Sequence, residues 1–162
     1  DFLHKRAVFT DDTLRLDGEL FLFSDVTDDP ANRAAAPKLQ EKIGGEFQPD
    51  VFAHEQHLIL ESGGKAVLLA GCAHKGIVNI LAAAKRHLGR MPDAVFGGFH
   101  LFELPPDAPD SLRLMDLTVK ALSEGDTVYY TGHCTGDWAY SQLKAALGER
   151  LQAMNCGTEM EI

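Results

Sequence analysis

The sequence predicts an α/β layered domain, and two observations carry that prediction. From Ala66 onward, apolar runs typical of strands alternate with apolar residues at helical spacing, in the order strand, helix, strand, helix, strand, helix. Such alternation is typical of domains in which helices cover a sheet. The 162 residues, 45% of them apolar and 24% charged, are enough for a sizeable core. We therefore expect residues 1–162 to form a single domain.

The first elements are expected in the turn-rich and acidic N-terminal third. Its best strand is Glu19–Ser24, where large apolar residues load both faces, and Asp25–Lys38 indicates a surface loop. A hairpin follows, in which the strands His57–Glu61 and Ala66–Ala70 are joined by the turn signal Ser-Gly-Gly-Lys. Because the second of these strands is apolar throughout, we expect it to be buried on both faces.

Helical spacing begins after the hairpin. The first helix should end at Gly89, and its apolar positions are Ile77, Ile80, Leu81, Ala84 and Leu88. After a short strand at Asp93–Phe96 comes a second helix, which Asp110 or Ser111 could cap. Its apolar face comprises Leu114, Met115, Leu117, Val119 and Leu122. Thr127–Thr131 is another strand, and the last helix begins near Asp137, with Ala139, Leu143, Ala146 and Leu147 on one side.

The charge balance and the missing motifs exclude several classes of function. Acidic residues outnumber basic ones by 24 to 15, and the formal net charge of −9 argues against a general nucleic-acid binder. A basic pocket for one small phosphate stays open. The sequence has no Gly-x-Ser-x-Gly elbow, no phosphate-binding Gly-x-x-x-x-Gly-Lys loop and no dinucleotide fingerprint after a strand.

The compartment is inferred from the apolar runs and the cysteines. No apolar run approaches the roughly 18 residues that a membrane helix requires, and the first residues lack the apolar stretch of a signal peptide. Three cysteines are too few, and odd in number, for a disulfide framework, so we expect a reducing cytoplasm. The sequence does not begin with Met, and we expect it to start within a longer protein.

Three predicted strands each end in a glycine-containing turn that carries a histidine. These turns are Gly71–His74, Gly97–His100 and Gly132–Cys134. Ligands bind at the carboxyl ends of strands in α/β sheets, and the turns are one helix-plus-strand unit apart, so the histidines should lie at one edge. Imidazole is a common metal ligand, and thiolate binds zinc or iron strongly. The alternative is that each histidine merely packs against or caps a strand end.

Other candidate residues have weaker support. Cys72 directly follows a buried strand and could be a ligand or a small buried apolar residue, whereas Cys134 should point away and Cys156 should be structural. Glu55 could bind a metal, orient a metal-bound histidine or face water, the last being the commonest outcome. The remaining histidines are not expected at a site. His87 should be solvated, His54 and His57 should point to different faces, and His4 lies in a terminal segment.

Four segments, in order, resemble one branch of the metallo-β-lactamase superfamily. They are Glu55-Gln56-x-Leu58, Gly71-Cys72-Ala73-His74-x-Gly76-Ile77-Val78-Asn79-Ile80, Gly97-Gly98-Phe99-His100-Leu101 and His133-Cys134-Thr135-Gly136. Proteins of that branch are often described as dihydropterin ribofuranosyl-aminobenzene phosphate synthases. The combination is specific, although each segment alone would be weak.

The resemblance implies an αββα sandwich, of which this chain would be the C-terminal half, with a mixed sheet, helices and a metal site at one edge. It implies that Gly71-Cys72 supplies a metal ligand and that His133 is the last ligand. It also implies that His100 occupies the position of an acid/base group. The superfamily's main metal motif, His-x-His-x-Asp-His, is absent from the 162 residues. We therefore expect an N-terminal half of the same fold as a partner, and exposed apolar surface on this chain without it.

The sequence thus predicts a metal-dependent hydrolase that acts on an ester or phosphoester bond of a small molecule, or in a pterin-linked condensation. We expect His74 and His133 as metal ligands, Cys72 as a further ligand, and His100 as a ligand or general acid/base. Zinc, as one or two ions, is the expected metal, with manganese or iron as alternatives. This chain alone should be inactive, and a homo-oligomer stays open. The competing hypotheses are a non-catalytic metal- or nucleotide-binding regulatory module and a redox diiron protein.

Overall fold

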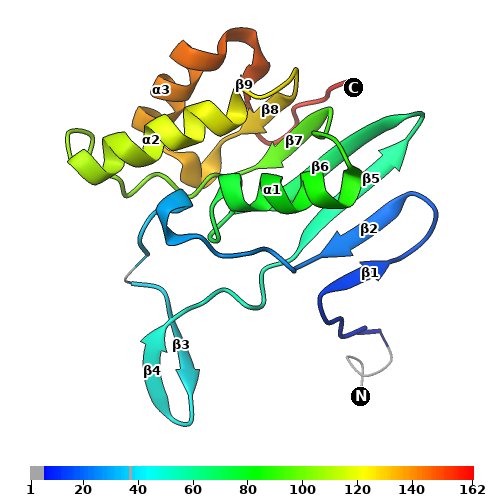
Figure 1. Ribbon diagram of the computed structural model, residues 1–162, viewed down its shortest axis with the longest axis horizontal. Coiled ribbons are helices and arrows are strands. Elements are labelled where there is room, and N and C mark those ends of the chain that lie inside the picture. The colour runs from blue at the N-terminus through cyan, green and yellow to red at the C-terminus, as the bar shows by residue number, and fades with distance from the viewer. Residues whose placement is uncertain (1–5, 37) are drawn as a thin grey trace.

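The computed structural model describes residues 6–36 and 38–162, and its main feature is a mixed sheet of seven strands in the order β1-β2-β5-β6-β7-β8-β9 (Figure 1). These strands are β1 (Thr13–Arg15), β2 (Leu20–Phe23), β5 (His57–Ser62), β6 (Lys65–Gly71), β7 (Ala94–Gly97), β8 (Val128–Thr131) and β9 (Leu151–Ala153). The helices are α1 (Ile77–Leu88), α2 (Pro109–Leu122) and α3 (Asp137–Leu147). The predicted α/β class is confirmed.

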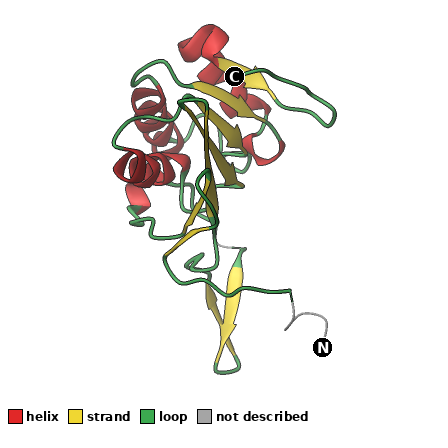
Figure 2. Ribbon diagram, turned by 90° about the vertical axis from the view of Figure 1, so that its right-hand side faces the viewer, coloured by secondary structure: helices red, strands yellow, loops and turns green. Residues whose placement is uncertain are grey.

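The sheet changes character at β6. From β1 to β6 the neighbouring strands run antiparallel, and from β6 to β9 they run parallel, each parallel pair being joined through one helix. Parallel crossovers are right-handed, and all three step in the same direction, so the three helices cover one face of the sheet. Figure 2 shows helices stacked along one side of the strands. This arrangement brings the carboxyl ends of β6, β7 and β8 to one edge.

The core lies between the sheet and the helices. Alternate residues of four neighbouring strands point to it and are fully buried, namely Ile59, Leu68, Val95 and Tyr129. The helices contribute one apolar stripe each, and residues of all three, such as Ile80, Leu122 and Leu143, belong to the same cluster. The helix-side face of the sheet is therefore a continuous packed layer.

The opposite face of the sheet is open. Leu60 and Leu69 are 37% and 41% exposed, and Phe96 and Tyr130 stack on each other there with ring centroids 4.6 Å apart. The prediction that Ala66–Ala70 is buried on both faces was therefore wrong: its residues alternate, and only one side is covered by helices. The apolar surface that was expected on this chain is present on this face.

The helix predictions were largely confirmed. Helix α1 ends where expected, at Gly89, whose φ of 71° is the left-handed conformation that favours glycine after a helix. The predicted caps of α2 were wrong, because the helix begins at Pro109 after Ala108, so Asp110 and Ser111 lie inside it. In α3, Ala146 is exposed and does not share the buried stripe.

Several short elements were not predicted. Strands β1 and β9 have three residues each, too few to show a period, and the hairpin of β3 (Gln40–Ile43) and β4 (Glu46–Pro49) is mostly polar. This hairpin projects away from the main sheet (Figure 1). The described residues of the predicted loop at 25–38 include one 3₁₀ turn, η1 (Pro30–Asn32), capped by the Asp29 side chain. His4 and Pro37 lie outside the described residues. No helix within the described ranges is long and apolar enough to cross a membrane.

Candidate metal centre

The three histidine-bearing turns meet at one edge of the sheet, as the sequence predicted. Gly71, Gly97 and Thr131 are in register across the parallel strands β6, β7 and β8, so the turns that follow them lie side by side. They enclose a cavity of about 300 Å³, lined by Leu39, Cys72, His74, His100, Phe102, His133 and Cys134. Every site residue predicted from the sequence contributes to this cavity.

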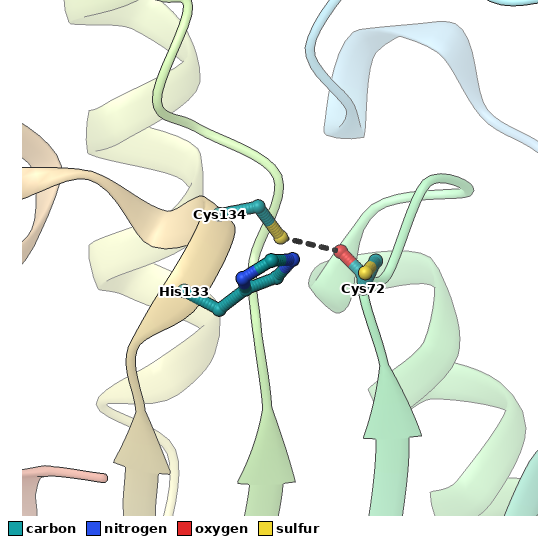
Figure 3. A group of neighbouring side chains, drawn as sticks. All are labelled: Cys72, His133 and Cys134. Atoms are coloured by element: carbon teal, nitrogen blue, oxygen red, sulfur yellow. Dashed lines mark hydrogen bonds between the residues drawn. The ribbon is translucent and has the colours of Figure 1, made fainter. Parts of the chain in front are cut away.

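Cys72, His133 and Cys134 form the tightest group in it (Figure 3). One ligand atom from each, the two sulfurs and a ring nitrogen, lie within 4.8 Å of one another. The Cys134 thiol also donates a hydrogen bond of 3.5 Å to the carbonyl oxygen of Cys72. The group draws on two turns that are 62 residues apart in the sequence.

The prediction that Cys134 points away was wrong. After β8 the chain enters a 3₁₀ turn, η2 (His133–Thr135), in which successive side chains are about 120° apart and no longer point in opposite directions as in a strand. His133 and Cys134 can therefore face the same group. Gly98 leaves the room for the sulfur, since a Cβ at that position would lie 2.5 Å from Cys134 Sγ.

His74 and His100 lie beside this group. Their rings are 4.5 Å apart, edge to face, and Phe52 packs against His74 at 4.8 Å. His100 is 9% exposed, and its Nδ1 is buried without a hydrogen-bond partner among the described residues. Burial, and next the neighbouring His74, lower the pKa of His100, so the ring is neutral near pH 7 and has a lone pair available.

Backbone strain gathers at the same place. Among the described residues, four that are not glycine have positive φ, namely Phe52 (54°), Ala73 (56°), His100 (48°) and His133 (50°). Two of these are candidate site residues, Ala73 lies between Cys72 and His74, and Phe52 touches His74. Positive φ is unfavourable for residues other than glycine. Residues that keep this conformation are concentrated at functional sites.

Glu55 anchors the turn that carries Cys72 and His74. Its two carboxylate oxygens accept hydrogen bonds from the backbone N–H groups of His74 at 2.7 Å and Lys75 at 2.9 Å. Its side chain is only 10% exposed, so the expectation that it faces water was wrong. The sequence could not reveal this role, since the contact joins residues on either side of a hairpin.

His57 supports the same turn from β5. Its Nδ1 donates to the carbonyl oxygen of Ala70 at 3.1 Å, while its buried Nε2 makes no hydrogen bond and lies 3.9 Å from Glu55. Burial is the main cause that lowers the pKa of His57, against the opposing effect of Glu55. His54 is exposed in the turn before β5, so the strand-based prediction that the two histidines point to different faces does not apply to it.

Two further residues differ from expectation. His87 is half-buried and bonds Asp25 at 2.8 Å, so it is not simply solvated. Cys156 is exposed and free, which does not fit a structural role. Neither residue belongs to the cavity at the strand ends.

The donor set at the cavity fits a transition metal such as zinc. Zinc binds sulfur at about 2.3 Å and imidazole nitrogen at about 2.0 Å, so tetrahedral ligands lie roughly 3.5–3.8 Å apart. The ligand atoms of Cys72, His133 and Cys134 lie within 4.8 Å of one another, so they would have to approach by about 1 Å at most to reach that spacing. Burial raises the pKa of the Cys134 thiol to about 11, so a metal ion would have to displace its proton.

Comparison with solved structures identifies a similar fold. The chain resembles the crystal structure of Tm1679, a metal-dependent hydrolase of the β-lactamase superfamily, with a TM-score of 0.80 and 24% sequence identity. The chain has a β-lactamase-like fold. The match covers 96% of this chain but spans only 58% of the Tm1679 chain. No protein-family model and no curated protein matches the sequence.

Proposed function

We propose that this chain is part of a metal-dependent hydrolase and supplies one side of its metal centre. The observation that carries the proposal is the convergence of Cys72, His133 and Cys134 at the carboxyl edge of a β-lactamase-like sheet. Such an edge is where α/β folds bind their ligands. The likeness to Tm1679, itself a metal-dependent hydrolase, supports the same assignment.

The proposed ligands are His133, Cys72 and His74, as the sequence predicted, with Cys134 added from the geometry. Two thiols and two imidazoles favour zinc over manganese, because manganese prefers oxygen ligands. Thiol ligands need a reducing compartment, which is consistent with a cytoplasmic protein whose cysteines are all free. The remaining ligands would come from an N-terminal half of the same fold, packed against the open face of the sheet.

The proposed reaction is hydrolysis of an ester or phosphoester bond in a small molecule. A bound zinc ion would lower the pKa of a water ligand and polarise the bond to be broken. His100, neutral and placed against His74, is positioned to accept or donate a proton beside that bond. Ala73, with its left-handed backbone, lies in the turn that brings His74 to the same cavity. A pterin-linked condensation would use the same groups.

Metal binding by the chain tests the proposal directly. Zinc content is measured by elemental analysis and affinity by competition with a chromophoric chelator. We expect the wild type to bind zinc, and Cys134→Ser and His133→Ala each to weaken it by about a hundredfold or more, since each removes one of few ligands. Cys156→Ser is the matched control, because that thiol is exposed and away from the cavity.

The outcomes separate the competing hypotheses. Zinc binding that is unchanged in both variants would overturn the proposed site. Tight metal binding without hydrolysis of phosphodiesters or thioesters, when the complementary half is present, would favour a regulatory binding module. An iron content with visible colour would favour a redox diiron protein.

A further inference from the structure

A second cavity adjoins the candidate metal centre. It has a volume of about 790 Å³, and His100 lines both cavities. The other walls come from residues between 30 and 35, from Lys38, from the loop 103–105 and from the first turns of α2. Much of this lining is apolar, including Ala31, Ala34, Leu104, Ala108 and Leu114. A molecule in this cavity would therefore reach the metal centre past His100.

Basic residues gather at this cavity in a chain that is acidic as a whole. The net charge of the chain is −9, yet Arg33, Lys38 and Arg113 all line the cavity. Arg33 is paired with Asp28 at 2.7 Å. Arg113 is different, because within the described residues its guanidinium makes no hydrogen bond and no ion pair.

Acidic residues at the cavity only partly offset these charges. Glu103 lines it, but Lys38 lies 2.8 Å from its carboxylate and neutralises it. Asp110, exposed at the start of α2, is a second carboxylate that lines the cavity, and it makes no ion pair with Arg113. The guanidinium of Arg113 is thus left as a cation available to a ligand.

The N-terminus of α2 adds donors that have no acceptor. This helix has 14 residues, and Ala108 before it offers no side-chain cap. In the part of the chain that the structure describes, the backbone N–H groups of Asp110 and Ser111 bond to no acceptor. Such N–H groups, together with the helix dipole, form a favourable place for an anion.

Ser111 is the observation that points to a ligand. The residue is only 2% exposed, yet it lines the cavity, and its hydroxyl makes no hydrogen bond to any described residue. The hydroxyl oxygen is not among the fully enclosed polar atoms of the described residues, so it stays accessible and can bond to a group bound in this cavity. The hydroxyl, the helix N-terminus and Arg113 belong to the same two turns of α2.

We propose that this cavity binds an oxyanion group of the substrate, a phosphate or a carboxylate, through Ser111, Arg113 and the N-terminus of α2. The inference rests on the proposed hydrolase function and narrows its substrate class to anionic molecules. The apolar wall would hold the body of the substrate. His100 would lie between the anionic group of the substrate and the metal ligands. The bond to be hydrolysed, next to the body of the substrate, would then lie at the metal centre.

The experiment titrates metal-free protein, kept in chelator, with inorganic phosphate, phenyl phosphate and benzoate, and follows binding by calorimetry. We expect saturable binding, stronger for the phenyl compound than for inorganic phosphate because of the apolar wall. Arg113→Gln should weaken binding about tenfold or more, since it removes a charge-assisted contact, and Ser111→Ala should weaken it several-fold. Lys120→Gln, which removes an equal charge from the other end of α2, should change it less than twofold.

Each outcome decides between alternatives. No saturable binding of any of the three probes, or equal affinities in Arg113→Gln and the wild type, would overturn the inference. An equal loss in Lys120→Gln would also overturn it, because it would indicate only general charge attraction. Benzoate binding more tightly than phenyl phosphate would identify the group as a carboxylate, and the reverse order would identify it as a phosphate. Because the protein is metal-free, failure of zinc binding would overturn the proposed function without affecting this result.

Discussion

The two ends of the central strands are built in different ways, although they belong to one sheet. At the amino end of β6 and β7, polar groups are paired: Asp93 accepts hydrogen bonds from the Ala66 N–H and from Arg90, both at 2.8 Å, and Lys65 lies 3.4 Å away. The Thr127 hydroxyl likewise donates to the carbonyl oxygen of Pro92 at 2.7 Å. Among the described residues of this end, none other than glycine has positive φ, although the buried Tyr129 hydroxyl near Thr127 has no hydrogen-bond partner.

The carboxyl end leaves polar groups unpaired. Ala73, His100 and His133 have left-handed backbone there, and buried nitrogens of His57 and His100 have no hydrogen-bond partner within the described residues. Such features are expected to be lost from a fold that is selected for stability alone. The carboxyl end therefore differs from the amino end chiefly in its strained backbone and in its unpaired histidine nitrogens, which is what the proposed ligand-binding role would require.

Replacing one carboxylate at each end by its amide should test this comparison. The loss of zinc affinity at the carboxyl end is the largest effect that we expect. Glu55 and Asp93 each accept a hydrogen bond from the backbone beside β6, at opposite ends. In Glu55→Gln the amide can accept only one of the two N–H groups that Glu55 now accepts. We expect zinc affinity to fall about 10- to 100-fold, the usual loss when an outer-shell partner is removed.

The matched variant Asp93→Asn should lower stability by about 1 kcal/mol but leave zinc affinity within about twofold. Chelator competition measures the first quantity and urea unfolding of the metal-free protein the second. If Glu55→Gln lost stability as Asp93→Asn does, yet bound zinc like the wild type, Glu55 would be purely structural and the contrast between the two ends would break down.

The parts of this contrast that the sequence predicted are those that depend on chain topology. Three strand-end turns with histidine were expected at one edge, because parallel strands joined by helices bring their carboxyl ends together. The helix over 77–88 and its end at Gly89 were also predicted, since both depend on local periodicity and on glycine's freedom at positive φ.

The parts that were missed depend on local geometry or on distant contacts. The direction of the Cys134 side chain follows from the 3₁₀ turn and from the positive φ of His133. Neither feature can be predicted from the residue types. The role of Glu55 requires a contact with His74, 19 residues away, that exists only once the hairpin has formed. The open face of β6 was missed because an apolar strand looks the same whether one or both of its faces are covered.

The pH dependence of stability should also differ between the two ends. The pKa of His57 is lowered, mainly by burial, so the unfolded chain takes up a proton below about pH 6.5 while the folded chain resists it. Stability contributed by neutral His57 is therefore full above pH 6.5 and is lost as the pH falls below it, by up to about 1.4 kcal/mol per pH unit. Asp93, whose pKa is lowered by the Ala66 N–H and Arg90 against the effect of burial, loses its contribution only near pH 4.

His57→Asn tests this difference, because asparagine can still donate to the Ala70 carbonyl but does not titrate. Unfolding free energies of the metal-free protein, measured by urea between pH 7.5 and 5, should fall less steeply in the variant. Glu55 and Lys75 also act on His57, and His100 keeps part of the slope, so the variant should be flatter than the wild type without becoming flat. If the unfolding free energies of the variant and the wild type fell in parallel with pH, His57 would not contribute to the pH dependence of stability.

The smallest effect expected is the relief of backbone strain at the carboxyl end. Ala70 and Ala73 are both fully buried, but only Ala73 has positive φ. Replacing either by glycine removes one buried methyl group and adds similar freedom to the unfolded chain. In Ala73→Gly these losses are offset by the relief of a left-handed alanine, which costs roughly 1–2 kcal/mol. We therefore expect Ala70→Gly to be more destabilising than Ala73→Gly by about 1 kcal/mol in urea unfolding. Equal losses would mean that the turn between Cys72 and His74 holds no strain, and the contrast between the two ends would then rest on the unpaired histidines alone.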